Sequence, residues 1–172
     1  RDPQFSGFTK LMRYGNQVSH LLCGAKHEAD VAIVYHAELE WCNGTSSMLT
    51  QVPAKLLYEQ QMDFDILPFD ALASANVEDG LLRVNEETYK ALLVPGCAAL
   101  PEALLAILQR LENAGLPVWF VEERPKEADF GLVVSQACLA EEAKKFATVH
   151  IAPANPLLRV YRAQREADWI YM

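Results

Sequence analysis

The sequence predicts an α/β protein in which helices cover both faces of a parallel sheet. The clearest evidence is a β-α-β unit in the middle of the chain. Residues 91–94 form an unbroken apolar run that ends at Pro95, as strands buried on both faces do. Leucines at helical spacing follow Pro101 and predict a helix that ends at Gly115. Residues 118–121 form the next apolar run. Two parallel strands joined by a helix explain this pattern.

Four elements are predicted before residue 70. Apolar residues repeat at helical spacing over residues 8–23, and Gly24 ends the predicted helix. Residues 30–36 contain a short apolar run that predicts the first strand. A second helix is expected over residues 48–62, where Pro53 is tolerated near the first turn, and residues 64–67 predict a second strand.

Three further elements complete the predicted sheet and its surroundings. Residues 76–84 predict a hairpin that turns at Asp79-Gly80. A helix is expected near residues 139–146, and a fifth strand over residues 149–151. Because β and α segments alternate and crossovers are right-handed, the simplest arrangement is a flavodoxin-like, doubly wound sheet of order 2-1-3-4-5.

The rhythm of the sequence changes from residue 157 onward. Leu158, Val160 and Arg162 alternate, and Trp169 and Tyr171 do the same, which predicts an antiparallel β segment. The chain opens without an initiator methionine and stops inside a predicted strand. We therefore expect it to be a segment of a longer polypeptide.

Composition excludes several classes of function. The 172 residues are 51% hydrophobic, enough for one substantial core, and the formal net charge of -8 argues against a nucleic-acid partner. No apolar run approaches the roughly 18 residues of a membrane span, so no membrane partner is expected. The four cysteines, Cys23, Cys42, Cys97 and Cys138, are scattered, which favours reduced thiols in a cytoplasmic protein over disulfides or a zinc site.

No motif predicts a cofactor or a metal. The chain has neither the glycine-rich dinucleotide fingerprint nor a phosphate-binding P-loop, and its His, Asp and Glu residues show no ligand spacing. Any ligand of a doubly wound sheet is expected beyond the carboxyl ends of its strands. The candidates for binding or interface contacts there are Glu38, Glu40, Trp41, Cys97, Glu122 and Glu123.

Each candidate has a plain interpretation beside the functional one. Cys97 could be a nucleophile at a strand-to-helix turn, or a small residue that fits the turn. A cysteine nucleophile needs a nearby base, and His36 at the end of a neighbouring strand is the candidate for it. The glutamates could pair as the carboxylates of a glycosidase, or be solvated loop residues. Trp41 could pack structurally, lie at an interface or stack on a sugar. We predict no catalytic residue in the chain.

Several short segments resemble a junction in the family 42 β-galactosidases and related bacterial glycoside hydrolases. There the last helical part of a catalytic barrel passes into a domain of class I glutamine-amidotransferase-like, flavodoxin-like fold, often called the trimerisation domain. The end of the chain resembles the start of a following β-sandwich. The segments that carry the resemblance are Arg13-Tyr14, residues 18–25, 29–35, Trp41, 89–96, Leu100-Pro101, 115–118, 158–162 and 168–171.

The resemblance implies a domain organisation and a set of partners. Residues 1–28 would be a helical linker from an upstream catalytic domain, 29–154 the flavodoxin-like domain, and 155–172 the start of a β-rich module. The implied function is that of a non-catalytic accessory or oligomerisation domain of a bacterial glycoside hydrolase. Its partners would be the catalytic barrel of the same polypeptide and further copies of itself, with carbohydrate contacted only indirectly.

One departure from the family's fold bears on chemistry. The amidotransferase fold carries its nucleophile on a glycine-flanked cysteine elbow, whereas residues 118–121 lead here into Glu122-Glu123 with no cysteine or glycine. Amidotransferase chemistry is therefore expected to be absent. The alternatives are an autonomous hydrolase or amidotransferase-like enzyme that uses Cys97, and a carbohydrate-binding module that uses Trp41.

Overall fold

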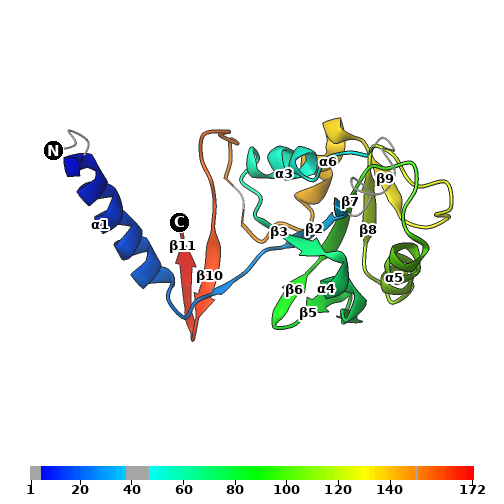
Figure 1. Cartoon of the computed structure of the whole chain (residues 1–172), viewed down its shortest axis with the longest axis horizontal. Coiled ribbons are helices and arrows are strands. Elements are labelled where there is room, and N and C mark those ends of the chain that lie inside the picture. Colours follow the sequence, from blue (N-terminus) through cyan, green and yellow to red (C-terminus); the bar gives the residue numbers. More distant parts are fainter. Residues whose placement is uncertain (1–4, 38–46, 150) are drawn as a thin grey trace. The chain divides into compact units, whose positions relative to one another are not determined.

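The computed structural model describes residues 5–37, 47–149 and 151–172, and the chain divides into two compact units. The sheet unit is Glu28–Val160, and the helix–hairpin unit combines Arg1–His27 with Tyr161–Met172. Figure 1 shows the elements of both units in chain order, coloured from blue to red.

A five-stranded parallel sheet forms the centre of the sheet unit. Its order is β3-β2-β7-β8-β9, so the strands run second, first, third, fourth, fifth along the chain, and the places of the first four agree with the prediction. The predicted fifth strand was wrong, because β9 fills that place and Val149 and Ile151 lie in no strand; His150 is outside the described residues. The strands are β2 (Val31–Tyr35), β3 (Phe64–Pro68), β7 (Ala91–Pro95), β8 (Val118–Val121) and β9 (Leu132–Val134).

Packed side chains cover both faces of this sheet. Successive strand residues point to opposite faces, so Ile33 and Leu93 join one core cluster while Val34 and Leu92 join the other. The first cluster lies under α3 (Gln51–Tyr58) and α6 (Gln136–Ala143), and the second under α4 (Phe69–Ala73) and α5 (Glu102–Asn113). The doubly covered sheet expected from the apolar runs is therefore present.

The two helices over the first cluster differ from their predicted bounds. The helix predicted over residues 48–62 is shorter at both ends, because α3 spans only Gln51–Tyr58. Pro53 then falls within the first turn, where its missing N–H has no intrahelical acceptor to lose. The last helix was predicted near residues 139–146. It begins and ends three residues earlier, as α6 (Gln136–Ala143), directly after the extended Ser135.

A small antiparallel sheet packs against the second cluster. The predicted hairpin is confirmed, and Asp79 and Gly80 both have positive φ (53° and 76°), as a two-residue turn between twisted strands requires. A third strand follows after a second tight turn at Asn85, whose φ is 54°. The strands are β4 (Asn76–Glu78), β5 (Leu81–Val84) and β6 (Glu87–Tyr89).

The helix–hairpin unit contains α1 (Phe5–Leu22) and a second antiparallel sheet. The order of that sheet is β1-β10-β11, with β1 at Lys26–His27, β10 at Arg162–Arg165 and β11 at Asp168–Tyr171. The predicted N-terminal helix and C-terminal antiparallel segment are confirmed. Leu158 and Val160, which were expected in that segment, lie before β10 and in no strand. No helix among the described residues is long and apolar enough to cross a membrane.

Candidate functional site

A cavity of about 290 Å³ lies at the carboxyl ends of β7 and β8. Both strands run in the same direction, so the residues that follow them meet at one edge of the sheet. The consecutive residues Glu122 and Glu123 line this cavity together with Gly96. The lining residues are Ser47, Met48, Val52, Gly96, Glu122, Glu123 and Gln136.

The turn after β7 is packed tightly against the end of β8. A Cβ atom added to Gly96 would collide with the carbonyl oxygen of Val121, so this position requires glycine. The backbone N–H of Met48 donates a hydrogen bond of 2.7 Å to the Gly96 carbonyl. Ser47 and Cys97 pair in an isolated antiparallel β-bridge. The cavity wall is thus built from close backbone contacts.

Glu122 occupies a strained turn at the end of β8. Its φ is 72°, and the Glu123 N–H donates to the Val121 carbonyl over 3.0 Å, which is the pattern of a classic γ-turn. The Glu122 carboxylate accepts a hydrogen bond of 2.9 Å from the Gln136 N–H, at the first residue of α6. Since Ser135 makes no side-chain cap, Glu122 supplies the cap from another segment of the chain.

Cys97 lies under this cavity and not in it. Its side chain is 1% exposed. Burial, with a smaller contribution from the charge of Glu123, raises the pKa of the thiol to about 12. A nucleophilic cysteine requires the opposite shift, so this environment suppresses the thiolate.

His36 is engaged at the end of β7 by a contact with the backbone of Pro95. Its Nε2 lies 3.3 Å from the carbonyl oxygen of Pro95, in hydrogen-bonding geometry, and the residue is 1% exposed. Nδ1 of His36 has no hydrogen-bond partner within the part of the chain that the structure describes. The bond to Pro95 fixes the imidazole in the interior at the end of β2.

The remaining candidates stay predictions. Glu38, Glu40 and Trp41 lie outside the described residues. Across residues 5–37, 47–149 and 151–172, no group of three or more His, Cys, Asp or Glu could hold a metal ion.

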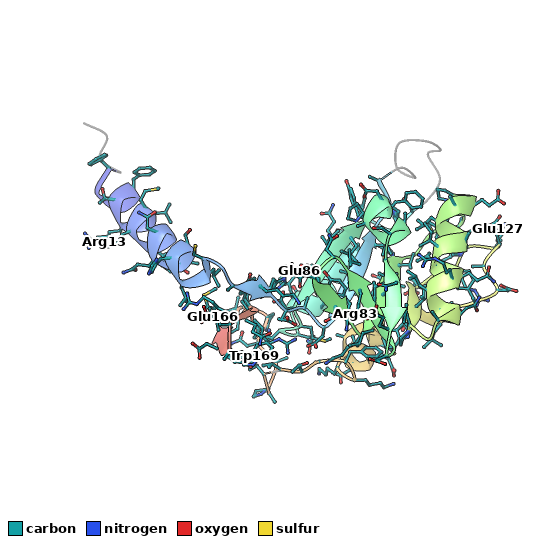
Figure 2. All side chains as sticks on the ribbon, turned by 90° about the horizontal axis from the view of Figure 1, so that it is seen from below. Arg13, Arg83, Glu86, Glu127, Glu166 and Trp169 are labelled. Atoms are coloured by element: carbon teal, nitrogen blue, oxygen red, sulfur yellow. The ribbon has the colours of Figure 1, made fainter. Side chains whose placement is uncertain are left out.

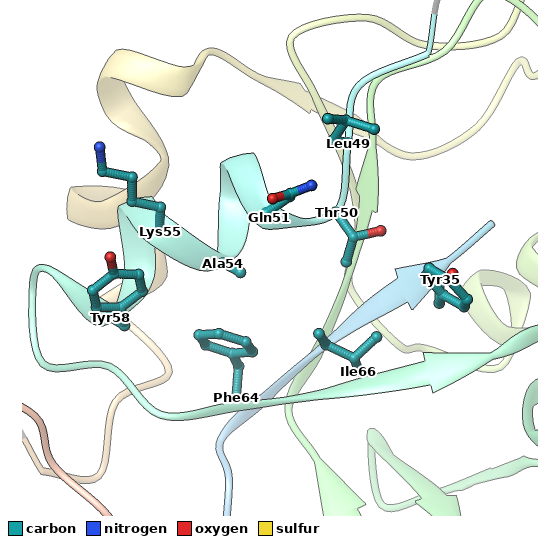
Figure 3. A pocket seen from close by; sticks show the side chains of 9 residues that line it. All are labelled: Tyr35, Leu49, Thr50, Gln51, Ala54, Lys55, Tyr58, Phe64 and Ile66. Carbon is teal, nitrogen blue, oxygen red and sulfur yellow. The ribbon is translucent and has the colours of Figure 1, made fainter. Parts of the chain in front are cut away.

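A larger, apolar cavity that sequence reasoning missed lies at the other edge of the sheet (Figure 3). We call it the edge groove, and its volume is about 570 Å³. Phe64 and Ile66 of the edge strand β3 form its floor, and α3 forms one wall. The lining residues are Tyr35, Leu49, Thr50, Gln51, Ala54, Lys55, Tyr58, Phe64 and Ile66.

The edge groove follows from the register of β2 and β3. Phe64 and Ile66 pair with Val31 and Ile33 and point to the same face of the sheet, but α3 leaves Ile66 49% exposed. The apolar residue at position 66 was the available signal in the sequence. Only the packing of α3 shows that this residue is uncovered.

A strap of residues 155–159 borders the groove at Tyr58. The Arg159 guanidinium lies 3.9 Å from the centroid of the Tyr58 ring. The buried Gln61 side chain donates to the carbonyls of Asn155 and Leu158, and its oxygen accepts from the Asn155 N–H over 2.9 Å. These bonds hold the strap, and with it one end of the groove.

The comparisons with known proteins give a fold and no family. No protein-family model matches the chain, and no curated protein matches it by sequence. Among solved structures, the rhamnosidase from Novosphingobium sp. PP1Y has a similar fold, with a TM-score of 0.58 and 15% sequence identity. The match covers 88% of this chain but only 17% of the rhamnosidase chain. A glycoside hydrolase therefore contains, as a small part of its length, a region that resembles this chain in fold.

Proposed function

We propose that the chain is a non-catalytic accessory and oligomerisation domain of a bacterial glycoside hydrolase. The observation that carries this proposal is the fold match, which covers nearly all of this chain and about a sixth of a rhamnosidase. A part of that size within a long glycosidase is consistent with an accessory role. The resemblance to the family 42 β-galactosidases points to the same class of enzyme.

The chemistry of the strand ends supports an inert role. Glu122 is engaged as a helix cap, and Cys97 is buried with a raised pKa. In the proposal, the sheet unit is a flavodoxin-like, class I glutamine-amidotransferase-like domain whose strand ends hold structural residues. Residues 1–28 would lead from a catalytic barrel, the barrel and further copies would be the partners, and the protein would be cytoplasmic.

The second candidate is an autonomous hydrolase or amidotransferase-like enzyme that uses Cys97. The position of this residue two places after the end of β7 favours it. Its burial and the carbonyl contact of His36 oppose it. We therefore rank the accessory role first.

Aryl-galactoside and aryl-rhamnoside hydrolysis by the chain tests the proposal. We expect no turnover above a buffer blank. Hydrolysis that Glu38→Gln or Glu122→Gln abolishes, while each variant keeps the wild-type circular dichroism spectrum, would overturn it. The sequence upstream of the segment is an independent test, because the proposal requires a barrel with two strand-end glutamates there.

A further inference from the structure

The edge groove has the size and the lining of a site for a small ligand. Its volume of about 570 Å³ falls within the range of about 300–1,000 Å³ that is usual for ligand pockets. Most of its lining is apolar or aromatic, with Phe64 and Ile66 on the floor and Tyr35 and Tyr58 at opposite ends (Figure 3). In such a lining a few polar groups fix the orientation of the ligand. The groove therefore fits an apolar body with polar ends.

The end of the groove at Tyr58 is basic. Lys55 is the only charged residue among the nine that line the groove, and the Arg159 guanidinium of the strap lies over the Tyr58 ring. The Lys55 ammonium lies 3.9 Å from the Glu59 carboxylate, in a pair whose side chains are 64% and 36% exposed. Because an exposed pair of this kind is weak, Lys55 is available to an anionic ligand. A carboxylate at this end meets two cations.

This basic end contrasts with the acidic charge of the sheet unit as a whole. The unit has nine Lys and Arg against twenty Asp and Glu. Glu127, for example, projects from its surface in Figure 2. At physiological salt, charges farther away than about 8 Å are largely screened, so the cations nearest the ligand determine which head group binds. An anionic head group is therefore favoured over a cationic one.

The end of the groove at Tyr35 contains a buried hydroxyl without a partner. Thr50 is 8% exposed, and its Oγ1 has no hydrogen-bond partner among the residues that the structure describes. Figure 3 shows this oxygen on the side of Thr50 that faces Tyr35. Buried polar groups are nearly always paired, because leaving one unpaired is costly. A polar atom at the far end of a ligand would supply the missing partner.

We propose that the edge groove binds a small apolar carboxylic acid that carries a second oxygen at its opposite end. The carboxylate meets Lys55 and Arg159, the apolar body covers the floor, and the second oxygen pairs with Thr50. From Thr50 to Tyr58 the helix rises about 12 Å, which sets the length of the ligand. The site uses none of the strand-end residues, so the inference goes beyond the proposed function and does not depend on it.

NMR titration of the isotope-labelled protein tests this site with decanoate and three compounds of the same chain length. Decanol is neutral, decylammonium is cationic, and ω-hydroxydecanoate adds the second oxygen. We expect decanoate to shift the amides of residues 49–58 and 64–66, and to bind there about two- to fivefold more tightly than decanol and decylammonium. The ω-hydroxy compound should bind about twofold more tightly still. Each methylene removed from decanoate should weaken binding by up to about fourfold.

Variants with matched controls separate the parts of the site. Lys55→Gln should reduce the preference for decanoate over decanol, whereas Lys126→Gln, in the loop after β8, should keep it. Thr50→Val should remove the preference for the ω-hydroxy compound and keep the binding of decanoate. Ile66→Glu should weaken decanoate and decanol by at least about tenfold, and Leu132→Glu on the opposite edge strand should not. Since Lys55 is exposed, Lys55→Gln keeps the test valid even if Ile66→Glu does not fold.

Any of four results overturns the proposal. They are no shift of the groove amides, equal affinity at the groove for decanoate and decylammonium, no gain from the ω-hydroxyl, and groove amides that shift with protein concentration alone. The last result would show that a second copy covers the groove. The glycoside assay remains separate, because turnover that depends on the strand-end carboxylates overturns only the proposed function.

Discussion

The carboxylate of Glu122 accepts a hydrogen bond of 2.9 Å from the backbone N–H of Gln136. The acidic residue at the end of β8 thereby caps α6, although its position beyond a parallel strand is one where catalytic groups are often found. Its left-handed backbone, with φ at 72°, aims the side chain at the helix. Strain at this turn serves the architecture of the sheet unit.

Replacing Glu122 should separate the cap from the strain. We expect Glu122→Ala to lower the free energy of unfolding by about 1 kcal/mol or more, because α6 loses its cap and the strain persists. Glu122→Gly should cost less, since glycine relieves the positive φ. Urea titration measures both, with Glu123→Ala as the control. Equal losses in the two variants would mean that the backbone of Glu122 is not strained.

Gly96→Ala should destabilise the sheet unit strongly. The added methyl group meets the backbone carbonyl of Val121, which no rotamer change can move. A loss of about 1–3 kcal/mol is expected from such overpacking. Gly7→Ala in α1 is the control, because a Cβ there contacts nothing. Thermal unfolding compares the two, and an unchanged midpoint for Gly96→Ala would contradict the close packing of β7 on β8.

Asp30 and Lys90 should stabilise the amino ends of β2 and β7. The Lys90 ammonium lies 2.7 Å from the Asp30 carboxylate, which also accepts from the N–H and hydroxyl of Thr148. We expect Asp30→Ala to lower the free energy of unfolding by about 1–3 kcal/mol, because the Thr148 donors lose their acceptor. Lys55→Ala, which breaks an exposed pair of 3.9 Å, should change stability by less than about 0.5 kcal/mol. Similar losses in both variants would contradict this difference.

Gln61 should control the strap of residues 155–159. Removing its amide in Gln61→Ala leaves the Asn155 N–H and the strap carbonyls without their partner. Hydrogen exchange in the strap should then rise by about tenfold or more. Gln60→Ala is the neighbouring control. If the exchange rates of the strap match those of wild type, the strap is held by other contacts.

The parallel sheet was predictable because its strands are continuous apolar runs bounded by turn residues. Residues 91–95 and 118–121 show this pattern most clearly, and both form strands that are buried along their whole length. β9 was missed because Leu132–Val134 is only three residues long and two of them are exposed. The pairing of β1 with β10 was also missed, since two residues at 26–27 carry no periodicity and their partners lie far along the chain.

The candidate site was only partly readable for a related reason. Position after a strand places Cys97 and Glu122 correctly at the strand ends, but it does not distinguish a buried thiol from an exposed one. It also does not reveal that Glu122 caps a helix more than ten residues away. The edge groove depends on how α3 packs against β3, and no local pattern encodes that contact.

Thiol reactivity is the most direct test of whether the strand ends hold a working nucleophile. Iodoacetamide labelling at neutral pH, followed by mass spectrometry, compares Cys97 with the exposed Cys23 and Cys138. Burial and a pKa raised from 9.0 to about 12 predict that Cys97 labels at least about a hundredfold more slowly, and as fast as the others once urea unfolds the chain. Faster labelling of Cys97 in the native protein would contradict the account and favour a cysteine enzyme.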